Sequence, residues 1–290
     1  MLDLLLQPFA YHYMVRAMWV SAIVGAACAF LSAYLMLKGW SLMGDALSHS
    51  VVPGVAGAYL LGLPYAAGAF FTGMLAALAM TLVRHITRLR EDAIIGFIFS
   101  FFFAVGLLII SLNPIAMNVD SIIFGNILGI ADDDVLQVEI IIFLSFSVLC
   151  VIWKDLLAVF FDENHAMSIG LSPLRLKIVF FTLLSACTVA ALQTVGAILV
   201  IAMVVTPGAT AYLLTDRFGR LLLIAIGIGA STSALGAYLS FYLDGATGGV
   251  IVTLQTVVFL FAFFLAPKYG QLAALRRRKT YAAHGRMRHD

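Results

Sequence analysis

Two side chains that often ligate metal ions lie four residues apart in a stretch of the chain that is otherwise almost free of charge. Asp45 is the acid, and His49 follows it. On a helix this spacing places both side chains on one face, about 6 Å apart along the axis. A carboxylate beside an imidazole is a usual beginning of a site for Mn²⁺, Fe²⁺ or Zn²⁺. The alternatives for this pair are a proton relay and a structural hydrogen bond between two helices.

Two prolines inside apolar stretches are expected to free backbone oxygen atoms. Because proline has no N–H, Pro53 cannot bond to the carbonyl of His49, four residues before it. Pro207 leaves the carbonyl of Met203 free in the same way. We expect a kink at each proline, and the freed carbonyl of His49 would supply a further oxygen ligand beside the imidazole.

Three other polar residues are weaker candidates for metal ligands. His12 stands between Tyr11 and Tyr13, where an aromatic anchor at the membrane surface is the main alternative. Asn118 and Asp120 belong to a polar segment between two apolar stretches, and simple solvation is the alternative for both.

The segment 162–170 predicts a short helix that stands alone between two apolar stretches. Asp162 and Glu163 suit a helix N-terminus, and Gly170 suits its end. Ser172 and Pro173 then resemble the cap and first residue of the next helix. A helix of about two turns is marginal in water unless it packs on something. It is therefore either a connector at the membrane surface or a docking helix for a cytoplasmic partner.

The composition of the chain is typical of a polytopic membrane protein. Of 290 residues, 63% are hydrophobic and only 11% are charged, and the mean hydropathy is +1.06. This is too little charge to cover a soluble core, so a cytosolic enzyme, a disordered chain and a nucleic-acid-binding protein are excluded. Cys28, Cys150 and Cys187 form no CxxC pair, so they predict neither a disulfide framework nor a zinc site.

The apolar stretches predict an all-α integral membrane protein with eight to nine transmembrane helices. A spanning helix needs about 20 mostly apolar residues, and Thr194 alone divides two of the stretches, so eight spans plus an irregular segment is the alternative. His49 would lie about 16 Å beyond Lys38, near the middle of a hydrocarbon layer about 30 Å thick. The nine expected spans are 14–37, 42–62, 64–84, 92–111, 135–153, 176–193, 195–214, 221–242 and 249–266.

The basic residues predict the orientation of the chain. With nine spans, all of the 17 lysines and arginines except Arg16 fall on one side, which is the cytoplasmic side by the positive-inside rule. The N-terminus is then outside and the C-terminus is cytoplasmic. We expect one permease domain over 1–268 and a basic cytoplasmic tail over 269–290, whose RRRK run at 276–279 suits anionic lipid headgroups. We expect no nucleic acid as a partner.

Five segments together resemble the permease subunits of ATP-binding-cassette (ABC) importers for manganese, iron and zinc. The resemblance covers about 10–268, and the form of the first segment is closest to the manganese and iron branch. Trp40 departs from the smaller apolar residue that is usual there, which leaves the packing of its loop in question. The segments are KGWSLMGDALSHSVVPG (38–54), EDAIIGFIFSFFFAVGLLI (91–109), DSIIFGNILG (120–129), FDENHAMSIGL (161–171) and QTVGAILVIAMVVTPGATAYLL (193–214).

This resemblance implies a homodimeric pore in the inner membrane of a bacterium, with two cytoplasmic ATP-binding subunits and an extracytoplasmic metal-binding protein. It implies that Asp45 and His49 contact transported Mn²⁺ or Fe²⁺, or Zn²⁺ as a further cargo, and that no cofactor is permanently bound. The segment 162–170, which includes Ala166, matches the coupling helix that contacts the ATPase. No phosphate-binding loop GxxxxGK[ST] occurs in the chain, so the energy for active transport would come from a partner or from an ion gradient, and the resemblance implies a partner that hydrolyses ATP. A self-contained proton-coupled metal carrier and a membrane scaffold are the rival hypotheses.

Overall fold

The computed structural model describes residues 6–40, 42–87, 89–113 and 132–266 of the chain. Every regular element in these ranges is a helix, as the sequence predicted. The elements are η1 (Gln7–Ala10), α2 (His12–Lys38), α3 (Leu42–Ser50), α4 (Val52–Leu61), α5 (Tyr65–Ile86), α6 (Glu91–Leu112), α8 (Asp132–Phe161), α9 (Glu163–Ser168), α10 (Pro173–Val195), α11 (Ala197–Leu214), α12 (Phe218–Leu243) and α13 (Thr247–Leu265).

Within the described ranges, seven helices are long and apolar enough to cross a membrane, and Val200–Leu214 of α11 forms a shorter apolar helix. The expected class of an all-α membrane protein is therefore confirmed. α10 and α11 are separate helices that meet at Gly196, whose φ of +85° favours glycine. The exact number of spans and the orientation in the membrane stay predictions. The tail 269–290 lies outside the described residues.

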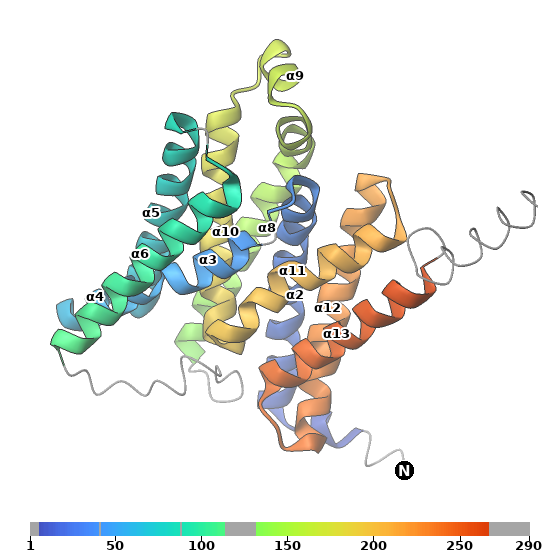
Figure 1. The fold of residues 1–290 in the computed structure, drawn as a ribbon. Helices are drawn as coiled ribbons and strands as arrows, with labels where there is room; N and C mark the ends of the chain where they lie inside the picture. The colour runs from blue at the N-terminus through green and yellow to red at the C-terminus, as the bar shows by residue number, and fades with distance from the viewer. Residues whose placement is uncertain (1–5, 41, 88, 114–131, 267–290) are drawn as a thin grey trace, which may run out of the picture.

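The expected span 42–62 is two short helices rather than one. α3 ends at Ser50 and α4 begins at Val52, with Pro53 in the first turn of α4. Proline is tolerated in a first turn but breaks a helix interior, because it lacks an N–H and clashes with the preceding turn. The kink expected at Pro53 is therefore a full interruption. Figure 1 shows α3 and α4 at about mid-height between the α9 end and the N-terminal end of the molecule.

Pro207 has a different outcome, because α11 continues through it. The hydroxyl of Ser32 on α2 donates to the carbonyl of Val205 (3.0 Å) and accepts from the N–H of Gly208 (3.0 Å). A neighbouring helix thus bonds the backbone groups on both sides of the proline, as membrane proteins often require. α11 is consequently held against α2 at this point.

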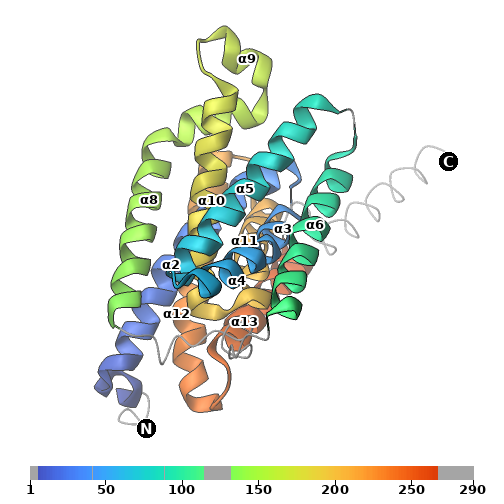
Figure 2. The ribbon, with the colours of Figure 1, turned by 90° about the vertical axis from the view of Figure 1, so that its left-hand side faces the viewer.

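α2 lies at the centre of the bundle and packs against α8, α10, α11 and α12. Its crossing with α12 is very close, because a Cβ added to Gly25 would lie 2.5 Å from the carbonyl oxygen of Gly229. Glycines at such contacts let membrane helices approach through their backbones. In Figure 2, α9 lies at the opposite end of the bundle from the N-terminus.

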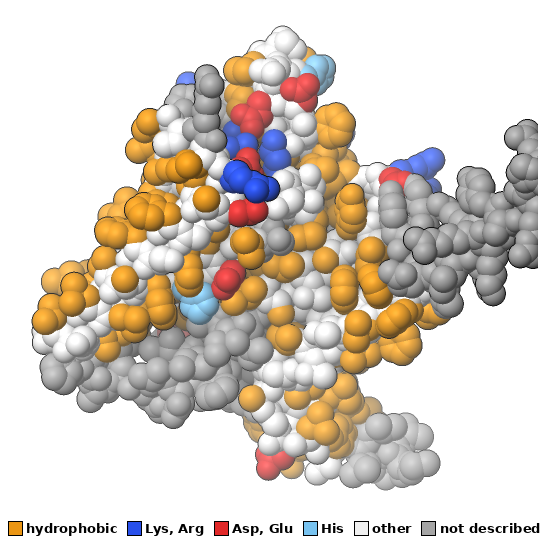
Figure 3. Space-filling view, viewed as in Figure 1, with side chains coloured by type: hydrophobic (Ala, Val, Ile, Leu, Met, Phe, Trp, Pro, Cys, Tyr) orange, Lys and Arg blue, Asp and Glu red, His pale blue; other side chains and the backbone are white. Residues whose placement is uncertain are grey.

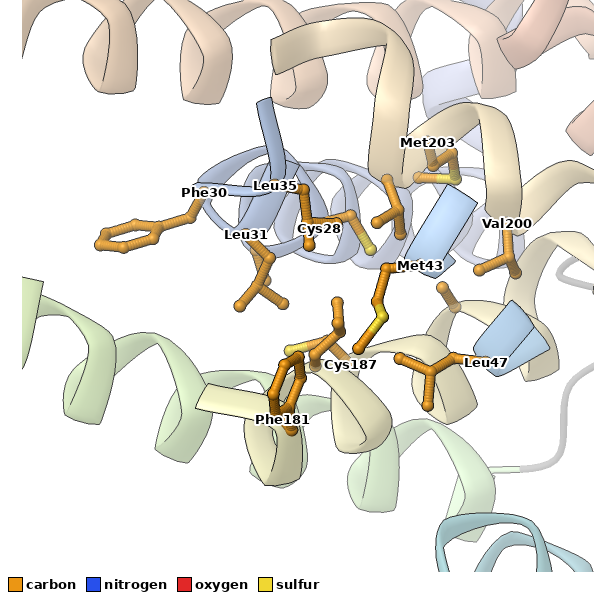
Figure 4. Packing of buried hydrophobic residues seen from close by; sticks show 14 of the residues in the cluster. Cys28, Phe30, Leu31, Leu35, Met43, Leu47, Phe181, Cys187, Val200 and Met203 are labelled. Carbon is orange, nitrogen blue, oxygen red and sulfur yellow. The ribbon is translucent and has the colours of Figure 1, made fainter. Parts of the chain in front are cut away.

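The core between these helices is apolar and rich in sulfur. Figure 4 shows Cys28 of α2, Cys187 of α10, Met43 of α3 and Met203 of α11 in one cluster of buried side chains. All three cysteines of the chain are free thiols. The buried side of α3 is packed into this cluster, and the side chains of Asp45 and His49, which are partly exposed, lie on another side of the helix.

Candidate metal site and cytoplasmic contact

Asp45 and His49 face each other on one side of α3, as their spacing predicted. The His49 Nε2 and Asp45 Oδ1 atoms are 3.3 Å apart. The side chains of Asp45 and His49 are 41% and 27% exposed in the single chain. The two residues are therefore adjacent, and both side chains are partly accessible on the surface of the single chain.

The open face of α3 contains Leu42, Asp45 and His49, whereas the side chains of Met43 and Leu47 on the other face are buried. The hydroxyls of the two serines of α3 bond to carbonyls of their own helix and not to the pair. A carboxylate near the middle of a membrane faces a water-filled path or another protein surface, because hydrocarbon would leave it unsolvated.

α6 forms an aromatic wall beside the imidazole. The ring of His49 makes edge contacts with Phe99 and Phe103, at centroid distances of 5.4 and 5.6 Å. Gly106 of the same helix lies against the α3–α4 break, where an added Cβ would come within 2.9 Å of the nitrogen of Pro53. α6 therefore fixes both the orientation of the imidazole and the position of the interruption that follows it.

The pair supplies two metal ligands of suitable chemistry and no complete coordination shell. Among the described residues, no group of three or more His, Cys, Asp or Glu side chains is placed to hold a metal ion. Mn²⁺ and Fe²⁺ accept carboxylate and imidazole ligands together. Water, backbone oxygen or a second copy of the chain must therefore complete any shell around an ion held here.

The weaker candidates are not brought to this pair. His12 is exposed at the beginning of α2, next to the rings of Tyr11 and Tyr13, which contact each other at 5.6 Å. The 27 residues of α2 span about 40 Å at 1.5 Å per residue, so His12 and the link to α3 lie at opposite ends of that helix. Asn118 and Asp120 lie outside the described residues.

A short helix occupies most of the segment in which we expected one. α9 begins at Glu163, and the carboxylate of Asp162 accepts bonds from the backbone N–H groups of Asn164 (2.9 Å) and His165 (3.2 Å). Gly170 follows the helix with φ +86°, which reverses the chain toward α10. Ala166 is fully buried, so α9 packs against its neighbouring helices α8 and α10.

Glu163 is the centre of an ion-pair network at this end of the molecule. Its carboxylate lies 2.6 Å from Nζ of Lys177, 3.7 Å from Nζ of Lys38 and 4.0 Å from a guanidinium nitrogen of Arg84. Arg84 also pairs with Glu91 at 2.6 Å. Burial alone would raise the pKa of Glu163, but the hydrogen bond and charge of Lys177, with the charges of Lys38 and Arg84, lower it overall. Figure 3 shows charged side chains gathered near the α9 end, with apolar side chains over most of the remaining surface.

Trp40 is packed into the same region and explains the departure noted in the sequence. Its ring is 5% exposed and contacts Phe160 and Phe181, at centroid distances of 5.5 and 5.7 Å. Its indole N–H donates to the carboxylate of Glu91, and the guanidinium of Arg84 lies 5.1 Å from its ring centroid. A large aromatic residue therefore fits this loop because it is both an apolar filler and a donor.

The sequence did not predict that these charged residues form one ion-pair network. Lys38, Arg84 and Lys177 were informative only as basic residues that set the orientation of the chain. A usable signal was present, because Glu91 and Glu163 are acids on the side where the basic residues gather. Nothing in the spacing, however, predicted which acid meets which base.

Comparisons with known proteins support one family for the whole bundle. The model of the ABC 3 transport family matches residues 10–266. The chain is 86% identical over 284 residues to the "Chelated iron transport system membrane protein YfeC" of Yersinia pestis, which covers 98% of this chain and 97% of the relative. It is 48% identical over 279 residues to the "Manganese transport system membrane protein MntB" of a Synechocystis strain, with coverages of 95% and 90%.

A solved structure shows the same fold. The structure titled "PsaBC from Streptococcus pneumoniae in complex with Fab" superimposes with a TM-score of 0.82 at 32% identity. The match covers 93% of this chain and 98% of the solved one. The similarity therefore extends over nearly the whole length of both chains.

Proposed function

Because this chain belongs to the ABC 3 transport family, we propose that it is the membrane-spanning subunit of an ATP-driven importer for divalent transition metals. Mn²⁺ and Fe²⁺ are the proposed cargo, since relatives are described as iron and manganese transport membrane proteins. Zn²⁺ is the alternative cargo, because it also accepts imidazole and carboxylate ligands. The chain would lie in the inner membrane of a bacterium, and a separate subunit would hydrolyse ATP.

The observation that supports this proposal most directly is the partly exposed Asp45–His49 pair on α3, a helix that lies at about mid-height in the bundle (Figure 1). A divalent ion that leaves water loses a very large hydration energy, which only charged or strongly polar ligands offset. Asp45 supplies the charge, and the neutral imidazole of His49 supplies a nitrogen ligand. The α3–α4 break beside them would leave the carbonyl oxygen of His49 available to the same ion.

A second copy of the chain is the proposed source of the missing ligands. Two side chains fill a minority of an octahedral shell, and the face of α3 that contains them is open in the single chain. Apposition of two such faces would bring two carboxylates and two imidazoles to one ion. Retained water would complete the shell, and incomplete protein ligation suits an ion that must also leave.

The proposed entry point for the energy of ATP hydrolysis is α9. This helix is capped by Asp162, buried at Ala166 and bonded to three other helices through Glu163. A structured helix at the end of the bundle, on the side of the basic residues, is a suitable surface for a cytoplasmic ATPase subunit. An extracytoplasmic metal-binding protein would deliver the ion at the opposite end.

The test is uptake of radioactive manganese or iron into proteoliposomes that contain the permease, the ATPase subunit and the binding protein. We expect uptake only with ATP inside the compartment that the ATPase faces. Asp45→Asn preserves shape and removes charge, so we expect it to lower uptake about 100-fold, in line with the loss of several kcal/mol of ion stabilisation. Normal uptake by Asp45→Asn would contradict the proposed site.

Glu139→Gln is a matched control for this variant. Glu139 is also an acid within a long apolar helix, α8, but it lines a groove with Trp19 and Phe143 rather than the α3 face. We expect this control to transport normally. Loss of the Asp45→Asn protein from the membrane, with normal Glu139→Gln protein, would indicate a structural hydrogen bond in place of a metal site.

A proton-coupled secondary carrier is the rival proposal, in which Asp45 binds a proton in each cycle. The purified chain alone, in liposomes with a proton gradient and no ATP, separates the two mechanisms. Metal uptake under those conditions would support the carrier and contradict the importer. Measurement of cellular manganese, iron and zinc in strains with and without the gene then identifies the cargo.

A further inference from the structure

The carboxylate of Glu163 connects α9 to helices other than its neighbours in the chain. Among the described elements, α9 packs against its chain neighbours α8 and α10. Glu163 connects α9 to two further helices, because its carboxylate also contacts Lys38 at the end of α2 and Arg84 near the end of α5. A displacement of α9 would therefore act on α2 and α5 through these charges.

The two residues that Glu163 contacts, Lys38 and Arg84, both lie next to the short link between α2 and α3. Lys38 is the last residue of α2, and Gly39 follows it with φ +72°. The backbone of Trp40 is bonded in both directions, since its N–H donates to the carbonyl of Leu35 (2.8 Å) and its carbonyl accepts from the N–H of Met43 (3.1 Å). Trp40 therefore ties the end of α2 to the first turn of the helix that contains the metal pair.

Arg84 reaches this link from the other side. Its guanidinium lies over the ring of Trp40 and pairs with Glu91 at 2.6 Å, while Glu91 also accepts from the indole N–H. The ring of Trp40 is thus held by a cation on its face and an anion at its edge. Glu163 contacts the same guanidinium and Lys38, so it is paired both with the last residue of α2 and with the cation that lies over Trp40.

We propose that Glu163 and Arg84 transmit the movement of α9 to the α2–α3 link, and thereby set the position of Asp45 and His49. They are positioning residues for transport and do not touch the ion. This inference rests on the proposed contact between α9 and an ATPase. The pairs are suited to the role because they are partly exposed, with side-chain exposures of 33% for both residues. Such pairs exchange partners at low cost, whereas a buried apolar contact would resist each cycle.

The test is the amount of manganese transported per ATP hydrolysed by the complete complex in proteoliposomes. Glu163→Gln and Arg84→Gln each remove one charge and nearly preserve shape. We expect each to lower the ratio about fivefold, the size expected for loss of a partly exposed ion-pair network. Arg175→Gln is the matched control, because Arg175 is exposed on the first turn of α10, and we expect its ratio to stay at the wild-type value.

A charge exchange distinguishes transmission from simple attachment of α9. Glu163→Lys combined with Lys177→Glu restores the closest pair, 163–177, but places a cation next to Lys38 and Arg84. If Glu163 only pins α9 to α10, this double variant regains the wild-type ratio, and that result would overturn the inference. We expect the ratio to remain low, because the contacts to α2 and α5 become repulsive.

Arg84→Lys keeps the inference testable if the glutamine variants fail to accumulate. Lysine retains the charge but loses the planar group that lies over Trp40 and pairs with Glu91. We expect normal abundance and a ratio lowered about twofold, and a wild-type ratio in this variant would overturn the inference. If uptake needs no ATPase at all, the proposed function fails. A normal ratio with ATP-dependent uptake overturns only the present inference.

Discussion

Two charged regions in the part of the chain that the structure describes are built in opposite ways. The pair on α3 consists of one acid and one histidine 3.3 Å apart, open on the side away from the core. The network at the α9 end connects two acids with three bases from α2, α5 and α10, and a tryptophan donor closes it. The pair on α3 supplies too few side chains for a complete metal coordination shell. In the network at the α9 end, the charged side chains have partners of opposite charge within the chain.

The contrast follows from what each region has to bind. An ion in transit needs ligands that are available and incomplete, since a saturated shell would hold it too strongly. A connection between helices needs partners already present within the chain, because charges left alone near a membrane are costly. Under the proposed function, the contrast separates the residues proposed to contact the ion from the residues proposed to position them, and the following experiments test that separation.

The largest effect is expected from Ala166→Pro in α9. Ala166 is fully buried, and its N–H donates to the carbonyl of Asp162 at 3.0 Å. Proline removes this bond and breaks the short helix at a cost of about 3 kcal/mol. We expect near-complete loss of transport and of metal-stimulated ATP hydrolysis, while metal binding at Asp45 and His49 persists. If assembly of the complex and stimulated hydrolysis are both intact, the contact with the ATPase lies elsewhere.

A smaller effect with a change of selectivity is expected from His49→Asp. The change replaces a nitrogen ligand with an oxygen ligand, and oxygen suits Mn²⁺ better than Zn²⁺. We expect manganese uptake to fall about tenfold, roughly the loss of one well-placed ligand. We expect the inhibition of manganese uptake by added zinc to weaken by more than the tenfold fall in manganese uptake itself. Competition curves measure both quantities, and an unchanged zinc sensitivity would show that His49 does not contact the ion.

A still smaller effect is expected from Trp40→Phe. Phenylalanine keeps most of the contact with Phe160 and Phe181 but removes the N–H that donates to Glu91. We expect the free energy of unfolding to fall by about 1.5–3 kcal/mol, the usual result when a hydrogen bond to a charged group is lost. Manganese transported per ATP should fall about twofold. A stability equal to that of the wild type would mean that the indole bond contributes little.

No effect of pH near neutrality is expected on the stabilising contribution of Glu163. The folded-state pKa of Glu163 lies below its ordinary value of 4.5, so the carboxylate is ionised in both folded and unfolded chains at neutral pH. Its stabilising contribution is complete above the ordinary value and is lost as the pH falls through the lowered pKa. Melting temperatures of wild type and Glu163→Gln should therefore differ by a constant amount between about pH 6 and pH 8. The difference between the two melting temperatures should become smaller under strongly acidic conditions, where Glu163 is protonated. If it becomes smaller near neutral pH instead, the lowered pKa of Glu163 is wrong.

Much of the fold follows from the sequence by itself. The lengths of the apolar stretches predict the seven helices that are long enough to span a membrane, because lipid offers no partner for backbone N–H and C=O groups. They did not predict that the stretch 42–62 is divided into α3 and α4. The i, i+4 spacing of Asp45 and His49 predicts that they share a face. The residues around α9 predict its start and end, because Asp162 and Gly170 act through local backbone bonds and geometry. Each of these features depends on neighbours within about two turns of one helix.

The tertiary structure alone decided the features that depend on residues distant in the sequence. Pro53 and Pro207 look alike in the sequence, yet α11 continues because Ser32 bonds its backbone, whereas the chain breaks before α4. The partners of Glu163 come from three other helices, and charge patterning along the chain cannot show which of them lie within 4 Å. Side-chain pairing across helices is set by how the helices pack, and that packing depends on close contacts such as Gly25 with Gly229 that no local rule specifies.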